Sequence, residues 1–203
     1  MNDHKLKDEL CRTMKELYAG KILTDIGGNL SFRSDDDDQF FWITPSGMKK
    51  DLVEPDHLVK MTMTGEVVGD NGTPSIEWPM HLRIYKEDED FKVIIHSHAP
   101  LATALSVLKS PPKIPPLTAE LVYLIPELVI VPYKPSGSEE LGKAVAEALW
   151  DCSVVIMENH GVLASGETFK DAAIKTRALE EYLQLYLDAK RFGGELREFP
   201  GFG

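Results

Sequence analysis

The stretch Val93-Ile94-Ile95-His96-Ser97-His98 joins a run of aliphatic residues to two potential metal ligands. Three aliphatic residues in succession predict a short buried β-strand, and residues i and i+2 of a strand point to the same face. His96 and His98 can therefore present two imidazoles side by side. A second apolar run, Val154 to Met157, leads to a third histidine, His160. We expect the three imidazoles to meet where the two strands end.

Three protein ligands around one divalent cation leave a coordination position open, which distinguishes a catalytic metal site from a structural one. The alternative is that His96 and His98 are surface residues at a strand end and that His160 is unrelated to them. The chain has only six histidines, and two of them share H-x-H spacing directly after an apolar strand. This spacing favours the metal site. Zn²⁺ is the first choice for three neutral imidazoles, with Mn²⁺, Fe²⁺ or Co²⁺ as alternatives.

The composition is that of an ordinary soluble globular protein, with 43% hydrophobic and 27% charged residues in a chain of 203. This length suits one sizeable core, so we expect a single domain over residues 1–203. The net charge of −11 argues against nucleic acid or an anionic membrane as the main partner. No basic patch is present that could offset repulsion by phosphate groups.

The sequence also predicts the compartment. No apolar run approaches the roughly 20 residues of a membrane span, and residues 1–5 are polar, without the apolar core of a signal peptide. Cys11 and Cys152 lack the spacing of a metal site, so we expect buried or idle thiols in a reducing environment. These features predict a cytoplasmic protein.

The rest of the sequence alternates between predicted helices and strands. Four apolar residues from Leu6 to Leu17 recur at spacings of three and four, which predicts an amphipathic helix over residues 3–19. Asp35 to Asp38 would form a solvated hairpin tip rather than a cation site. Further helices are predicted at 79–85, near 101–105, at 138–149 and after Thr168, and strands at 30–33, 40–44, 58–63, 66–68, 93–96, 129–131 and 154–157. This order predicts a single three-layer α/β domain with a central, mainly antiparallel sheet.

A carboxylate partner for the metal site is expected from the turn at residues 73–79. Glu77 is the best candidate, because it lies beside Trp78, where partial desolvation could raise its pKa towards that of a general base. The alternative is a carboxylate at a helix N-terminus that interacts only with the helix dipole.

Two loops that combine glycine with hydroxyl residues are candidates for anion binding. They are Gly27-Gly28-Asn29 with Ser31, and Thr44-Pro45-Ser46-Gly47. Backbone N–H groups in such loops can point at a phosphate. Loops of this kind are more often simple turns, and neither has the spacing of a P-loop or of a dinucleotide-binding motif.

Taken together, five motifs resemble the class II aldolase/adducin family over nearly the whole chain, and within it the branch of L-fuculose-1-phosphate aldolases. The motifs are GGNLS (27–31), TPSG (44–47), PSIE (74–77), HSHAP (96–100) and NHG (159–161). The resemblance implies a zinc-type site at His96, His98 and His160, with Glu77 as the acid/base residue. It implies a phosphate pocket formed by Gly28, Asn29, Ser46, Gly47 and Ser75. It also implies a homotetramer with active sites between subunits.

By this resemblance the protein is a metal-dependent aldolase that cleaves a ketose 1-phosphate to dihydroxyacetone phosphate and an aldehyde through a metal-stabilised enediolate. The same intermediate serves a decarboxylase, a dehydratase or a 4-epimerase of a sugar phosphate or sugar acid, which is the alternative. The related 4-epimerase has aspartate in the place of Glu77, which favours carbon–carbon cleavage. A non-catalytic adducin-like module is a third possibility, although that branch lacks the histidine set.

Three departures from the fuculose branch concern the substrate and the proton donor. Ile26 and Ile76 stand where that branch has hydroxyl residues, and an aliphatic side chain cannot donate a hydrogen bond to phosphate. The branch also uses a tyrosine after the proline-rich loop as proton donor. Here that stretch, residues 117–120, reads Leu-Thr-Ala-Glu, so Glu120 is the candidate replacement. The alternative is that Glu120 is simply a carboxylate at the start of a helix.

Overall fold

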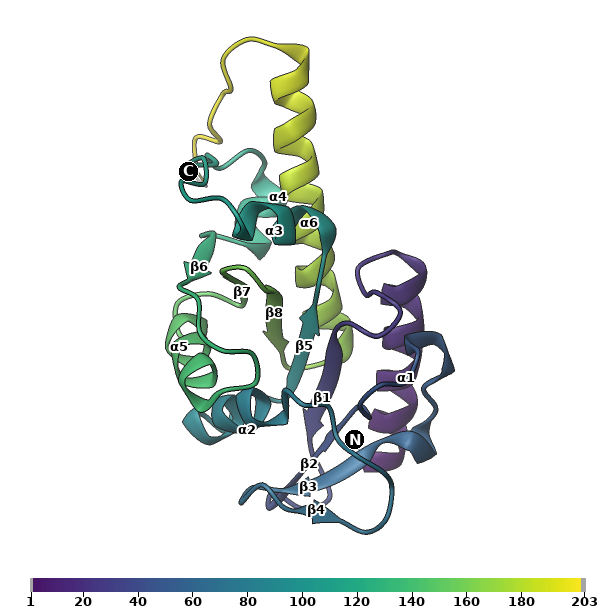
Figure 1. The fold of residues 1–203 in the computed structure, drawn as a ribbon. Helices are drawn as coiled ribbons and strands as arrows, with labels where there is room; N and C mark the ends of the chain where they lie inside the picture. Colours follow the sequence, from purple (N-terminus) through teal and green to yellow (C-terminus); the bar gives the residue numbers. More distant parts are fainter. Residues whose placement is uncertain (1, 202–203) are drawn as a thin grey trace.

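A mixed sheet of eight strands forms the centre of the structure, a computed structural model that describes residues 2–201 (Figure 1). Its strands are β1 (Asn29–Arg33), β2 (Phe40–Ile43), β3 (Val59–Thr62), β4 (Val67–Val68), β5 (Val93–Ser97), β6 (Val129–Val131), β7 (Val154–Met157) and β8 (Gly161–Gly166). Their spatial order is β4-β3-β2-β1-β5-β8-β7-β6. Neighbouring strands are antiparallel except β6 and β7, which are parallel.

Helices cover both faces of this sheet, so the predicted three-layer α/β class is confirmed. One face packs against α1 (Asp3–Ala19), α3 (Pro100–Ser106), α4 (Ala119–Leu124) and α6 (Phe169–Phe192), and the other against α2 (Trp78–Glu87) and α5 (Glu139–Leu149). Two short 3₁₀ helices, η1 (Lys50–Leu52) and η2 (Pro55–His57), follow β2. Within residues 2–201, no helix is both long and apolar enough to cross a membrane.

Burial on both faces explains why the central strands are continuously apolar. In β5, Val93 and Ile95 pack with the residues of α1 and α6, whereas Ile94 packs with those of α2 and α5. In β7, Val155 likewise faces α5 and Ile156 faces the opposite layer. A strand covered on both sides has no solvent-facing positions, so its sequence lacks the polar alternation of a half-exposed strand.

Most predicted elements are present, with ends that match or shift by at most two residues, but β8 was missed. The sequence suggested that the chain passes from His160 directly to the last helix. Instead, residues 161–166 form a strand that pairs with both β5 and β7. The stretch Gly-Val-Leu-Ala-Ser-Gly lacks the length of an apolar run and begins and ends with glycine, so it carries a weak strand signal. The two 3₁₀ helices were also not predicted, and α4 was expected only as a helix start at Glu120.

Several smaller expectations can be compared with the structure. Asp35 to Asp38 are exposed and connect the antiparallel strands β1 and β2, as a hairpin tip should. Cys11 and Cys152 are buried and free. The single domain over 1–203 stays a prediction, and residues 1, 202 and 203 lie outside the described part of the chain.

Candidate functional site

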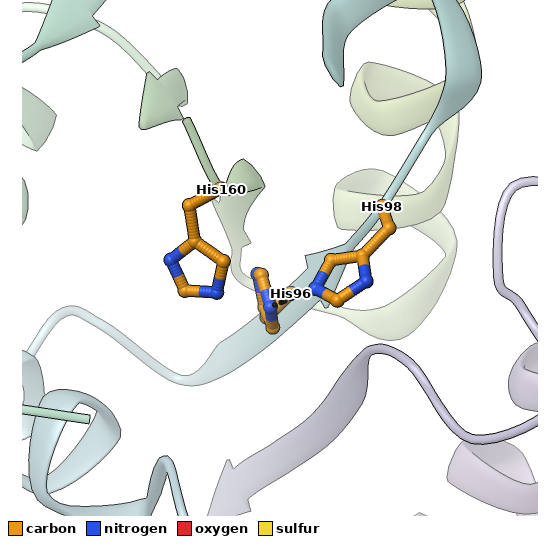
Figure 2. A group of neighbouring side chains, drawn as sticks. All are labelled: His96, His98 and His160. Carbon is orange, nitrogen blue, oxygen red and sulfur yellow. Dashed lines mark hydrogen bonds between the residues drawn. The ribbon is translucent and has the colours of Figure 1, made fainter. Parts of the chain in front are cut away.

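The three histidines lie together at one end of β5 and at the neighbouring β7–β8 turn (Figure 2). His96 belongs to β5, where it is paired with Asn29 of β1 on one side and Leu163 of β8 on the other. His98 follows two residues later, and His160 occupies the tight turn between β7 and β8. The expected meeting of the three imidazoles is therefore seen, although His160 comes from a hairpin turn.

The ligand nitrogens of the three imidazoles lie within 4.8 Å of one another. The Nε2 atoms of His96 and His98 are 3.1 Å apart. Nδ1 of His96 is 2.9 Å from the carbonyl oxygen of Val162. A carbonyl oxygen only accepts, so Nδ1 carries the proton and Nε2 is left with a free lone pair directed at the centre of the cluster.

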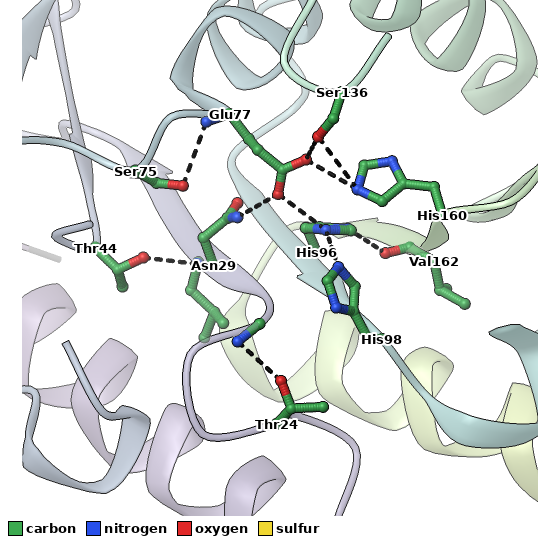
Figure 3. Close-up of polar contacts among 12 residues, drawn as sticks. Thr24, Asn29, Thr44, Ser75, Glu77, His96, His98, Ser136, His160 and Val162 are labelled. Carbon is green, nitrogen blue, oxygen red and sulfur yellow. Dashed lines mark hydrogen bonds and ion pairs between the residues drawn. The ribbon is translucent and has the colours of Figure 1, made fainter. Parts of the chain in front are cut away.

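The Glu77 carboxylate faces these rings (Figure 3). Its Oε2 is 3.0 Å from Nε2 of His96, and its Oε1 is 3.0 Å from Nε2 of His160. Asn29 Nδ2 donates to Oε2 at 2.7 Å, and Ser136 Oγ donates to Oε1 at 2.7 Å. Glu77 precedes α2 without its side chain capping the helix. The interpretation of Glu77 as a simple helix-terminal carboxylate is therefore wrong.

This set of atoms fits a divalent cation. Carboxylate oxygens and an unprotonated Nε2 all offer lone pairs, and such atoms repel one another unless a proton or a cation lies between them. Three imidazole nitrogens with a nearby carboxylate are a donor set typical of Zn²⁺ and similar transition metals. His96, His98 and His160 are the residues that could hold the ion.

Electrostatics keep the site in the ionisation state that a metal needs. Burial opposes ionisation of Glu77, but the close imidazoles of His96 and His160 and the hydrogen bond from Ser136 outweigh it and hold the pKa of Glu77 below its usual range. The expected rise of the Glu77 pKa is therefore wrong, because its partners, absent from the local sequence, dominate over desolvation. Burial, together with the nearby His96 and His160, lowers the pKa of His98 to about 4, so this ring is neutral at pH 7 and able to bind a cation.

The loop before β1 approaches the histidines closely because it contains two glycines. A Cβ atom on Gly27 would lie 2.6 Å from Nδ1 of His98. Gly28 has φ +89° and a Cβ there would lie 2.8 Å from the carbonyl oxygen of His96. Only glycine allows this backbone path and this approach.

A cavity of about 510 Å³ opens in front of the histidine cluster. Its lining includes Glu77, His98 and His160, and also all five residues expected to bind phosphate, namely Gly28, Asn29, Ser46, Gly47 and Ser75. The loops are joined by hydrogen bonds from Ser46 N to Thr73 O (2.9 Å) and from Ser75 N to Thr44 O (3.0 Å). Phosphate binding by this set stays a prediction.

Not every expected residue belongs to the cavity. Ser31 lies on the same face of β1 as Asn29, but two residues farther along the strand and beneath α2, where its Oγ is 2.6 Å from Nδ1 of His81 and 2.7 Å from the hydroxyl of Tyr85. It does not line the cavity, so its inclusion in the glycine loop was wrong. Glu120 is exposed in the first turn of α4 and does not line the cavity of its own chain. Ile26 and Ile76 do line it, with 70% and 74% of their surfaces exposed.

Two functional candidates were missed from the sequence. Ser136 lies in the loop after β6, and besides its bond to Glu77 its hydroxyl is 3.5 Å from Nε2 of His160. Lys50 is buried in the cavity wall. Ser136 stands in a Pro-Ser-Gly turn and Lys50 in a Lys-Lys pair, and both patterns are common on protein surfaces.

Known proteins are similar to this chain in sequence and in fold. Residues 8–187 match the family model described as class II aldolase and adducin N-terminal domain. The chain is 32% identical over 177 residues to an L-fuculose phosphate aldolase of Methanococcus maripaludis, covering 87% of this chain and 93% of that protein. It is 30% identical over 189 residues to a 3-oxo-tetronate 4-phosphate decarboxylase of Haemophilus influenzae, covering 92% and 89%.

A solved structure of an L-fuculose 1-phosphate aldolase superposes with a TM-score of 0.84 at 32% identity, covering 97% of this chain and 91% of that one. The relatives therefore include enzymes named for cleavage of a sugar phosphate and for decarboxylation of a sugar-acid phosphate. The matched region covers most of the chain, and the architecture is the same as in the solved relative, so the family can be assigned. The chain belongs to the class II aldolase/adducin family.

Proposed function

We propose that this protein is a metal-dependent aldolase that cleaves a ketose 1-phosphate of the L-fuculose 1-phosphate type to dihydroxyacetone phosphate and an aldehyde. The observation that carries the proposal is the Glu77 carboxylate, 3.0 Å from His96 and from His160 in the wall of a cavity. The similarity to L-fuculose phosphate aldolases supports the substrate class.

His96, His98 and His160 would hold the divalent cation, with Zn²⁺ as first choice and Mn²⁺, Fe²⁺ or Co²⁺ as alternatives. When bound, such an ion supplies Lewis-acid stabilisation of negative charge on the oxygens of the substrate. The bond from His96 Nδ1 to Val162 O fixes the ring in the tautomer that ligation requires.

Glu77 would move the proton at carbon 3 of the substrate. In the cleavage direction the ionised Glu77 carboxylate takes the proton of the hydroxyl on carbon 4, the C3–C4 bond breaks with its electron pair left on carbon 3, and Glu77 returns that proton to carbon 3. Asn29 and Ser136 each hold one oxygen of the Glu77 carboxylate, so they act as positioning residues. A fixed carboxylate meets the geometric requirement of general acid/base catalysis.

The phosphate would lie against the two loops, with the hydroxyls of Ser46 and Ser75 and the backbone of Gly28 and Gly47 around it. Asn29 is the exception in this set, because its side-chain amide is engaged by Glu77.

A second candidate is decarboxylation of a 3-oxo sugar-acid phosphate. It is favoured by the similarity to the 3-oxo-tetronate 4-phosphate decarboxylase and by the absence of tyrosine from the described cavity lining. Loss of carbon dioxide also leaves an electron pair on a carbon next to a carbonyl group. That carbon then takes one proton from water, which Glu77 is placed to relay.

The deciding experiment is a substrate screen with metal-reconstituted protein. L-Fuculose 1-phosphate, 5-deoxy-D-ribulose 1-phosphate and 3-oxo-tetronate 4-phosphate would be tested, with dihydroxyacetone phosphate and carbon dioxide measured separately. Aldehyde and dihydroxyacetone phosphate from a ketose phosphate support the aldolase. Carbon dioxide alone supports the decarboxylase, and no turnover by metal-loaded protein supports the adducin-like module.

We also propose that the protein is a cytoplasmic homotetramer with active sites between subunits. Large apolar residues on the surface of the chain, such as Tyr123, Trp150 and Phe192, are consistent with further burial in an assembly. Glu120, which lies outside the cavity of its own chain, would serve as proton donor only if a neighbouring subunit brought it there. Light scattering after gel filtration tests the tetramer, and a monomer at working concentration contradicts it.

A further inference from the structure

Lys50 is a buried cation in the wall of the cavity that contains Glu77. It begins η1, three residues after Gly47, and only 2% of its surface is exposed. Its backbone N–H donates to the carbonyl oxygen of Asp25 at 3.1 Å. Lys50 is thus connected to both glycine-containing loops. It closely follows the loop at 44–47 in the chain, and this hydrogen bond joins it to the loop that contains Gly27 and Gly28.

Within residues 2–201, the ammonium group of Lys50 forms no hydrogen bond and no ion pair. Its neighbour Lys49 differs, because it is exposed, pairs with Asp51 at 3.2 Å and lies 5.3 Å from the centre of the Tyr18 ring. The two adjacent lysines therefore have different surroundings. Lys49 forms an ion pair at the surface, whereas Lys50 is unpaired at the cavity.

A lysine that is largely buried and whose ammonium group is not directly paired with an anion is unfavourable. Burial accordingly lowers the pKa of Lys50, although attraction by Glu77 acts in the opposite direction. Lys50 is the only lysine or arginine in the described lining of this cavity. An anion bound in the cavity would supply the missing opposite charge.

We infer that Lys50 provides the positive charge that binds the anionic end of the substrate, its phosphate ester. This inference rests on the proposed function and adds a residue to it. Ser46 and Ser75 offer hydroxyl groups to the same cavity, whereas Ile26 and Ile76 offer none, so the charge of Lys50 carries a larger share of the binding. Lysine suits this role because its ammonium group acts as a point charge towards phosphate oxygens.

The test uses inorganic phosphate as probe, with binding measured by calorimetry and by the phosphate-dependent rise in Tm. Lys50→Met keeps the apolar stem and removes the charge, Lys50→Arg keeps the charge, and Lys49→Met is the matched surface control. Lys50→Met should weaken phosphate binding by about tenfold or more, while Lys49→Met should bind as the wild type does. Lys50→Arg should retain part of the affinity, and all three variants should keep their metal content.

A second readout separates binding from a structural role. Without phosphate, Lys50→Met should have a Tm equal to or above that of the wild type, because the unpaired buried charge is gone. If Lys50→Met does not fold, Lys50→Gln replaces it as the uncharged variant. The inference is overturned if the wild type binds no phosphate, if the uncharged variant binds it equally well, or if Lys49→Met loses as much affinity.

The outcome is distinguishable from failure of the proposed function, because phosphate binding requires no turnover. Phosphate binding that depends on Lys50, in a protein that cleaves no sugar phosphate, supports this inference and refutes the aldolase. A Lys50→Met enzyme that cleaves a sugar phosphate with unchanged KM refutes the inference and leaves the aldolase standing.

Discussion

Two walls of the cavity differ in how their side chains are held. The histidine wall consists of His98, His160 and Glu77, together with the buried His96 that contacts His98 and Glu77. Each Glu77 oxygen and the His96 ring have hydrogen-bond partners. The loop wall consists of residues 26–28, 45–50 and 75–76, where Ile26 and Ile76 are exposed and Lys50 is unpaired.

The difference follows from what each wall must do. Bond cleavage depends on reacting groups held within a fraction of an ångström, and a displacement of about 1 Å can reduce the rate by about a hundredfold. Recognition of an anion by hydroxyl groups and one lysine tolerates larger changes in the positions and identities of the side chains. We therefore expect changes in the histidine wall to abolish the reaction and changes in the loop wall to alter the substrate.

The largest effect is expected from the histidines. His96→Ala, His98→Ala and His160→Ala should each lose the metal and the activity while keeping the fold, because His98 and His160 line the cavity and the buried His96 belongs to neither hydrophobic core cluster. Metal analysis and circular dichroism of the purified variants test this, with the exposed His4→Ala as control. Full metal content in any two of the three variants contradicts the three-histidine site.

Glu77→Gln should keep the metal and lose about a hundredfold or more in rate, because a general acid/base is removed while the shape is retained. The measurement is exchange of the proton at carbon 3 of dihydroxyacetone phosphate with solvent. Exchange near the wild-type rate would exclude Glu77 from the proton transfer.

The loop wall should give a smaller change that is restricted to phosphorylated substrates. Ile26→Thr combined with Ile76→Ser should tighten binding of a ketose phosphate by about tenfold, since two hydroxyl donors return. Ser75→Ala should raise KM for phosphorylated substrates and leave unphosphorylated ones little changed. If neither change alters the preference for the phosphorylated form, these loops do not bind phosphate.

The smallest effect concerns pH. The folded state holds the pKa of His98 at about 4, below its ordinary value, so at intermediate pH the unfolded chain binds a proton that the folded chain does not. After metal removal with a chelator, the free energy of unfolding should therefore decrease as the pH falls from about 6.5 towards 4. Urea unfolding measures this, and the slope should be smaller in His98→Ala. An equal slope in that variant would show that His98 does not cause it.

Local sequence patterns were enough to predict much of the fold and part of the candidate site. The apolar run of Val93 to Ile95 and the two-residue spacing of His96 and His98 are properties of neighbouring residues, so they were readable in the sequence. Ser136 and Lys50 were not, because their importance depends on which distant segments pack beside them. The predicted direction of the Glu77 pKa shift was wrong for the same reason. The residues that lower this pKa are 19 to 83 residues away along the chain.

The hydrogen bond from His96 to the carbonyl oxygen of Val162 has a consequence for how such proteins diversify. Val162 contributes a backbone atom, which every amino acid possesses, so mutation of its side chain leaves the acceptor in place. What holds the ring is the alignment of β5 with β8, and a slip of one residue would turn His96 to the other face of the sheet. The orientation of a catalytic group is thus inherited through strand pairing, while the loops across the cavity are free to acquire new substrates.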